Sequence, residues 1–147
     1  VILSPVGSYY KEGINPVGIM IEDQDVRAVR GGTGYAKCGG NYAAATRATV
    51  KAEKAGYDQV LWLDGEHLKY VQEVGAMNMM FLIDGKLVTA PLHDTILPGI
   101  TRNSVIQLLQ KWGVKISERK LSIQDIEAAA KLMMDGKLGL AQSKYNG

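Results

Sequence analysis

The sequence has little of what marks several large classes of protein. Its 147 residues include one cysteine, Cys38, which excludes a disulfide-stabilised scaffold. No apolar run approaches the roughly 20 residues that a membrane-spanning helix needs, and no charged-then-apolar leader opens the chain. The net charge of +2 is too small to indicate a nucleic-acid partner. His67 and His93 have no partner at a metal-ligand spacing, so no metal site is expected.

These absences predict a soluble protein of the cytoplasm, or of an organellar stroma or matrix, with no nucleic-acid or membrane partner. The hydrophobic residues make up 46% of the chain, which is enough to form a core and excludes a disordered protein. The length suits one domain over 1–147. The chain opens with Val1-Ile2-Leu3, without methionine or a polar lead-in. We therefore expect a piece of a longer protein, with part of any site outside it.

Apolar stretches and turn residues predict alternating strands and helices. Asn41 is expected to cap a helix that ends at Gly56, Asp84-Gly85 predicts a hairpin turn, and Ser122 with Asp125 has capping-box spacing. The expected strands cover 1–6, 16–22, 59–63, 70–74, 78–83, 86–89 and 115–120, with a short candidate at 26–29, and the expected helices cover 42–55, about 101–112 and 123–134. Strands outnumber helices and tight turns join several of them. We expect an α+β fold with a mixed, mostly antiparallel sheet flanked by helices.

Five glycines surround a lysine, Lys37, within residues 31–40. Such a density marks backbone that takes positive φ or approaches a ligand closely. The segment is no phosphate-binding P-loop, because Lys37 lacks the preceding glycine and the following Ser or Thr, and no G-x-G-x-x-G opens a helix here. An exposed loop lysine is the plain interpretation. A lysine in a crowded apolar loop can instead lose its proton and attack carbonyl groups.

Four spaced motifs carry a resemblance that extends over about 1–138. They are Gly31-Gly32-Thr33-Gly34-x-x-Lys37-x-Gly39-Gly40-Asn41-Tyr42-Ala43, Asp58-Gln59-Val60-Leu61-Trp62-Leu63-Asp64, Glu73-Val74-Gly75-Ala76-Met77-Asn78 and Leu97-Pro98-Gly99-Ile100-Thr101-Arg102. In this order they resemble the branched-chain amino acid aminotransferases, which are pyridoxal 5'-phosphate enzymes of fold type IV. The resemblance implies the large cofactor-binding domain of that fold, with a sheet or pseudo-barrel. It also implies transamination between leucine, isoleucine or valine and 2-oxoglutarate.

The resemblance also implies roles for single residues. Lys37 is the catalytic lysine that forms the Schiff base with the cofactor and then moves the substrate's α-proton. Tyr42 binds the cofactor's ring oxygen and Glu73 its pyridine nitrogen, the alternatives being a packed aromatic and a solvated carboxylate. The other implied positions are Leu97 near the ring, Gly99, Ile100 and Thr101 at the phosphate, and Gly75 and Ala76 in the substrate pocket, unless these two only permit a tight strand crossing.

The start of the predicted helix near Thr101 favours a phosphate on physical grounds as well. Free N–H groups and the positive end of the helix dipole point at one spot there. Arg102 is expected either to add its charge at this spot or to lie solvated on the helix.

The sequence departs from the family in two places. By the resemblance, the family's small N-terminal domain is absent from the sequence. Residues 139–147 either replace the Gly-Thr-Gly-Thr-Ala segment with which the family binds phosphate and substrate, or correspond to a more distal part of the family reached by a deletion. Two functions therefore stay open. One is an aminotransferase acting on amino acids and 2-oxo acids, as a homodimer or with a complementing chain. The other is a truncated or engineered scaffold with little or no catalysis.

Overall fold

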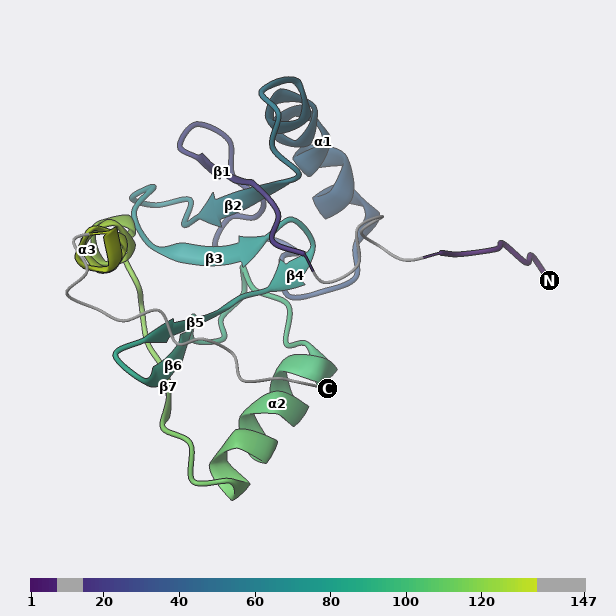
Figure 1. Cartoon of the computed structure of the whole chain (residues 1–147). Coiled ribbons are helices and arrows are strands. Elements are labelled where there is room, and N and C mark those ends of the chain that lie inside the picture. Colours follow the sequence, from purple (N-terminus) through teal and green to yellow (C-terminus); the bar gives the residue numbers. More distant parts are fainter. Residues whose placement is uncertain (8–14, 135–147) are drawn as a thin grey trace.

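The computed structural model describes residues 1–7 and 15–134. The elements are β1 (Ile19–Glu22), α1 (Gly39–Lys54), β2 (Gln59–Leu63), β3 (Val71–Val74), β4 (Met77–Asn78), β5 (Met80–Ile83), β6 (Lys86–Thr89), α2 (Ile100–Lys111), β7 (Ile116–Glu118) and α3 (Ile123–Met134). Helices α1 and α2 lie at opposite ends of the molecule, with the strands between them (Figure 1). The predicted α+β class is confirmed. The divergent segment 139–147 lies outside the described residues.

The strands form two mixed sheets. One has the order β1-β2-β3-β4 and the other the order β5-β6-β7. The β1–β2 and β6–β7 pairs are parallel, and the β2–β3, β3–β4 and β5–β6 pairs are antiparallel. Asp84 and Gly85 join β5 to β6 and both have positive φ, as a type I′ hairpin turn requires. The predicted hairpin is therefore confirmed.

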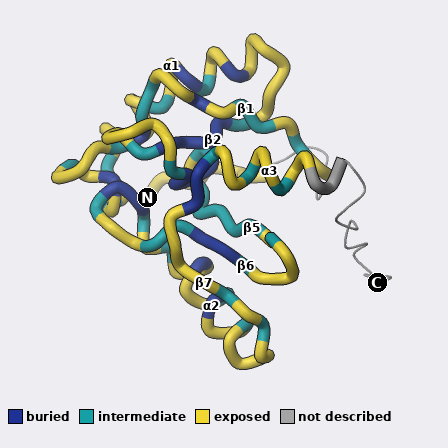
Figure 2. Tube along the Cα trace, turned by 90° about the vertical axis from the view of Figure 1, so that its left-hand side faces the viewer, coloured by how far each residue is buried: buried dark blue, intermediate teal, exposed yellow. Residues whose placement is uncertain are grey.

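Strand β2 supplies two hydrophobic clusters, one on each face of its sheet. The cluster against α1 consists of Ala48, Ala52, Val60 and Trp62, and the other consists of Leu61, Leu63, Val71 and Val74, with Ile123 and Ile126 of α3 packed against it. Because side chains alternate along a strand, a strand covered on both faces must be apolar throughout. Figure 2 shows this buried stretch at β2 beneath the largely exposed α1.

The helix ends agree only partly with the sequence patterns. The N–H of Ser122 donates to Asp125 Oδ2 at 2.9 Å and the N–H of Asp125 donates to Ser122 Oγ at 3.1 Å, so the predicted capping box is confirmed. Helix α1 begins earlier than predicted, after Cys38 as N-cap. Asn41 therefore lies inside the helix. Its side-chain amide donates instead to carbonyls of the preceding loop.

Three predicted strands need correction. Residues 1–7 form no strand, and Ile2, Leu3 and Val6 are exposed, because no other described strand supplies a hydrogen-bond ladder for them. Residues 26–29 also form no strand. The predicted strand 78–83 is interrupted at Met79, where the chain leaves the first sheet and enters the second.

Candidate active site

The glycine-rich segment is a loop tied down by its own side chains. The Asn41 amide donates to two loop carbonyls at 2.9 and 3.0 Å, and the Thr33 hydroxyl donates to Asn41 Oδ1 at 2.8 Å. Gly34 is buried, and a Cβ atom there would lie only 2.7 Å from the Cα of Thr95. No side chain fits at this position. The loop is thus fixed three residues before Lys37.

Lys37 lies at a cavity of about 760 Å³ between this loop, β4 and the start of α2. We call it the Lys37 cavity. Its lining consists of Lys37, Ala76, Met77, Asn78, Met80, Leu97, Pro98, Gly99, Ile100, Thr101, Arg102 and Val105. Six of the nine residues predicted for the site therefore meet in one cavity although the sequence separates them widely: Lys37, Ala76, Leu97, Gly99, Ile100 and Thr101.

Helix α2 begins at this cavity. Gly99 is its N-cap, and its first turn contains no acidic residue. The first N–H groups of an α-helix have no partner within the helix, so those of Ile100 and Thr101 are available to an anion. A Cβ atom at Gly99 would collide with Asn78 Oδ1, so a larger residue there would displace the Asn78 side chain, which Glu73 and Leu97 hold in place.

Arg102 lines the Lys37 cavity, but it is not solvated. Its side chain is only 4% exposed. Its Nη2 donates to the carbonyl of Ala90 at 2.9 Å and to Glu118 Oε2 at 2.6 Å. The solvated position is therefore wrong, and Nη2 of the guanidinium is held by β7 and by the carbonyl of the residue after β6.

Glu73 lies on β3 behind the Lys37 cavity and is 1% exposed, so the solvated carboxylate is excluded. Its Oε1 accepts the Leu97 N–H at 2.9 Å and the Asn78 amide at 3.1 Å, and its Oε2 lies 3.0 Å from Arg27 Nε. Burial raises the pKa of Glu73, while Arg27, the Leu97 N–H and the Lys37 ammonium act to lower it. Lys37 and Glu73 therefore interact electrostatically.

Tyr42 and Gly75 do not line the cavity. Tyr42 is 46% exposed in the first turn of α1, so it is not a packed aromatic. Gly75 has a φ of 55°, and a Cβ atom there would collide with the Gln59 side chain. Its carbonyl accepts the Trp62 Nε1–H at 2.9 Å. The backbone thus requires glycine at position 75, in the turn between β3 and β4.

Two residues of this site, Arg27 and Asn78, were not predicted from the sequence. Arg27 is 8% exposed, and its Nη2 donates to the carbonyls of Gly34 at 3.0 Å and Thr95 at 2.6 Å. The sequence offered one signal for Arg27, a charged residue within the apolar stretch 26–29. An arginine that such a stretch buries is expected to have a charged or polar partner. Asn78 bridges the Glu73 carboxylate and the Leu97 carbonyl, and only its place in a quoted motif marked it.

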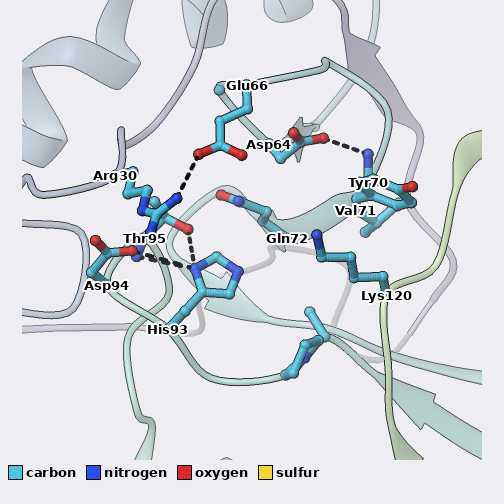
Figure 3. Close-up of a pocket in the computed structure, with 13 residues that line it drawn as sticks. Arg30, Asp64, Glu66, Tyr70, Val71, Gln72, His93, Asp94, Thr95 and Lys120 are labelled. Atoms are coloured by element: carbon cyan, nitrogen blue, oxygen red, sulfur yellow. Dashed lines mark hydrogen bonds and ion pairs between the residues drawn. The ribbon is translucent and has the colours of Figure 1, made fainter.

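A second cavity of about 390 Å³ is lined by side chains of both charge signs. Figure 3 shows Gln72 in its middle, with the Arg30–Glu66 pair above and His93 below. None of the predicted site residues lines it. Gln72 Oε1 is buried and has no hydrogen-bond partner among the described residues. A single free acceptor among two cationic side chains and three carboxylates indicates no ligand class, so the Lys37 cavity is the candidate active site.

Asp64, on the wall of this second cavity, is expected to make stability fall in acid. Burial opposes its ionisation, but the N–H groups of Tyr70, Lys69 and His67 and the His67 ring outweigh that effect and hold its pKa at about 2. A native pKa below the unfolded value stabilises the fold above about pH 4, by about 2 kcal/mol here, and this is lost as the pH falls towards 2.

Urea unfolding of wild type and Asp64→Asn at several pH values measures this contribution. The difference in unfolding free energy should be largest above about pH 5 and shrink by about 1 kcal/mol at pH 3. Asp23→Asn, at an exposed position, is the control. A difference that does not vary with pH would contradict the assignment.

The described part of the chain offers no other obvious chemistry. Among residues 1–7 and 15–134, no group of three or more His, Cys, Asp or Glu side chains is arranged to hold a metal ion. Nor, in these ranges, does any helix combine the length and apolar content needed to cross a membrane.

The fold is that of the fold type IV aminotransferases. The structure is similar to the crystal structure of a branched-chain aminotransferase from the thermophilic archaeon Thermoproteus uzoniensis with norvaline, at a TM-score of 0.76 and 31% identity, over 86% of this chain and 41% of that one. The chain belongs to the amino-transferase class IV family, whose family model matches residues 6–139. The resemblance inferred from the motifs is thereby confirmed.

The chain spans little more than a third of the length of the curated relatives that it matches. Branched-chain-amino-acid aminotransferase 2 of Bacillus subtilis (strain 168) is 58% identical over 131 residues, which is 89% of this chain and 36% of that protein. Branched-chain-amino-acid transaminase 1 of the same organism is 52% identical over 131 residues, 88% of this chain and 37% of that protein. The crystal structure of a branched-chain amino acid aminotransferase from Thermobaculum terrenum, in its PLP-bound holo form, has a TM-score of 0.67 and 28% identity, over 74% of this chain and 35% of that one.

Proposed function

We propose that this chain is the cofactor-binding part of a pyridoxal-phosphate-dependent branched-chain amino acid aminotransferase. The reaction exchanges an amino group between leucine, isoleucine or valine and 2-oxoglutarate. The observation that carries the proposal is that Lys37 and the start of α2 line one cavity, with the buried Glu73 bonded to two residues of its lining, Asn78 and Leu97. The names of its close relatives support the substrate class.

The groups around the cavity suit the three ends of pyridoxal phosphate. The Lys37 amine is a nucleophile for the cofactor's aldehyde carbon. The N–H groups of Ile100 and Thr101, with the Thr101 hydroxyl, suit a phosphate, and Gly99 lets it approach the backbone. Glu73 suits a protonated ring nitrogen. Once bound, the cofactor supplies an electron-accepting ring.

In this proposal the chain's own residues transfer the proton, keep the ring nitrogen protonated and position the cofactor and the substrate. With cofactor and substrate bound, the free Lys37 amine would move a proton between the substrate's α-carbon and the carbon of the cofactor's former aldehyde group. Glu73 keeps the ring nitrogen protonated. Tyr42, one turn into α1, donates its phenol to the ring oxygen, and Leu97 packs beside the ring. Gly75 and Ala76 leave space for the branched side chain of the substrate.

A second candidate function is a chain that holds the cofactor without turning over substrate. Ile100 is 86% exposed at the cavity, an apolar surface that no described residue covers. The aminotransferase proposal therefore includes a second copy of the chain, or a complementing chain, that closes the cavity over the substrate. Without such a partner, binding of the cofactor alone is the expected activity.

Pyridoxal phosphate, borohydride and leucine together test both candidates. We expect the purified chain to develop a visible absorption band with the cofactor, and borohydride to fix the cofactor on Lys37, as located by peptide mass mapping. Bleaching of the band by leucine supports the aminotransferase, whereas a band that leucine leaves unchanged supports the second candidate. Label scattered over surface lysines would overturn both. Pyridoxal without its phosphate is the matched control and should bind more weakly.

A further inference from the structure

We propose that Arg27 is a positioning residue that keeps Glu73 negatively charged and, with the same guanidinium, holds the loop that carries Lys37. The proposal rests on the proposed function, because it gives Arg27 a part in binding pyridoxal phosphate. Arg27 itself does not line the Lys37 cavity. It acts through the residues that it holds.

The guanidinium connects three segments that are distant in sequence. Its Nε lies 3.0 Å from Glu73 Oε2 on β3. Its Nη2 donates to the carbonyl of Gly34 at 3.0 Å and to that of Thr95 at 2.6 Å. Gly34 precedes Lys37 by three residues and has no room for a side chain. One planar group thus fixes the Glu73 carboxylate and the approach of the backbone to Lys37.

The charge of Glu73 depends on this contact. Glu73 is 1% exposed, and an isolated carboxylate at such a depth takes up a proton. The charged groups that act on it are Arg27 and Lys37, and its neutral donors are the Leu97 N–H and the Asn78 amide. Lys37 changes its bonding when it attaches the cofactor, whereas Arg27 does not. Arg27 is therefore the permanent cation beside Glu73.

Two substitutions separate the charge from the shape of the side chain. Arg27→Met removes the charge but keeps a long apolar stem. Arg27→Lys keeps the charge, but a single ammonium cannot reproduce a planar fork that serves Glu73, Gly34 and Thr95 together. The matched control is Arg47→Met, because Arg47 pairs with Asp25 at the surface.

The first measurement is the dissociation constant of pyridoxal phosphate between about pH 6 and pH 9. In Arg27→Met, Glu73 should be protonated at the lower pH values, and binding should weaken by at least about tenfold, since an adjacent opposite charge moves a carboxyl pKa by about 1–3 units. The ratio to wild type should fall as the pH rises and Glu73 ionises, down to a constant remainder that reflects the lost contacts to Gly34 and Thr95. Arg27→Lys should recover this pH profile but capture the cofactor on Lys37 more slowly. Arg47→Met should behave as wild type.

The second measurement needs no cofactor. Infrared spectra of the cofactor-free chain at neutral pH should show a protonated carboxylic acid in Arg27→Met that is missing from wild type and from the Arg27→Met/Glu73→Gln double variant. A ratio of dissociation constants that is the same at every pH, with no carboxylic acid band, would overturn the proposal and leave Arg27 a structural residue.

If wild type fails to bind the cofactor, the proposed function falls, but the infrared comparison still decides whether Arg27 sets the charge of Glu73. If circular dichroism shows that Arg27→Met is unfolded, the same two measurements on Arg27→Lys decide: a wild-type pH profile with slowed capture supports the proposal, and wild-type behaviour in both overturns it.

Discussion

Replacement of Lys37 by alanine is expected to abolish covalent capture of pyridoxal phosphate. Among the described residues that line the cavity, Lys37 is the one lysine, so none of the others offers an amine to the aldehyde carbon. Any transamination should fall by at least about 10²–10⁴-fold, the usual contribution of a positioned acid–base group. The measurements are the visible absorption band and the peptide map after borohydride reduction.

Two additions sharpen the test of Lys37. Lys86→Ala, at the exposed start of β6, is the matched control and should capture the cofactor as wild type does. A small primary amine added to Lys37→Ala should restore part of the proton transfer, because it supplies the missing base without the covalent tether. Capture of the cofactor on another lysine in Lys37→Ala would show that the active amine has been misassigned.

Replacement of Trp62 by alanine is expected to have the largest effect on stability. Trp62 has no exposed surface, packs against α1, and donates its indole N–H to the Gly75 carbonyl at 2.9 Å. Loss of a buried aromatic of this size costs about 3–5 kcal/mol, a large share of the about 5–15 kcal/mol that holds a domain folded. Urea unfolding followed by circular dichroism measures the difference.

Trp112 provides the control for Trp62, because it is the other tryptophan and is 66% exposed. Trp112→Ala should change the unfolding free energy by less than about 1 kcal/mol, as exposed substitutions usually do. Equal losses in the two variants would contradict the assignment of Trp62 to the core.

The sequence was informative wherever a local pattern decides the structure. The apolar run at β2, the Asp84-Gly85 turn and the Ser122–Asp125 box each depend on neighbours in sequence, and each was predicted. Residues 1–6 have a strand-like composition, but a strand also needs a partner, which composition cannot reveal. Asn41 has the chemistry of a helix cap, yet the glycine-rich loop passes close enough to use its amide instead.

The candidate site also has features that the sequence predicts and features that depend on contacts between distant residues. Glycine density marked the loop around Lys37 and helix physics marked the start of α2 as a place for a phosphate. The family resemblance alone connected the two into one site before any fold was known. The burial of Glu73 and its contact with Arg27 depend on how β3 lies against residues 27 and 97, which are far from it in sequence. Arg102 is the opposite case. It lies inside a motif that the sequence singles out, yet its side chain forms an ion pair with Glu118, which the motif does not contain.

The two parallel strand pairs have a consequence for how a bound molecule is held. Strand β1 reaches β2 through the glycine-rich loop and α1, and β6 reaches β7 through residues 90–99 and α2, so each sheet has its own crossover connection. Lys37 lies on the first crossover and Ile100 begins the helix of the second. The proposed covalent anchor, Lys37, and the proposed anion site at the start of α2 therefore belong to the crossovers of different sheets, and these sheets are joined at Met79. The spacing between them is set by how the two sheets lie against each other, and a sliding of one sheet on the other would weaken cofactor binding while both loops kept their shape.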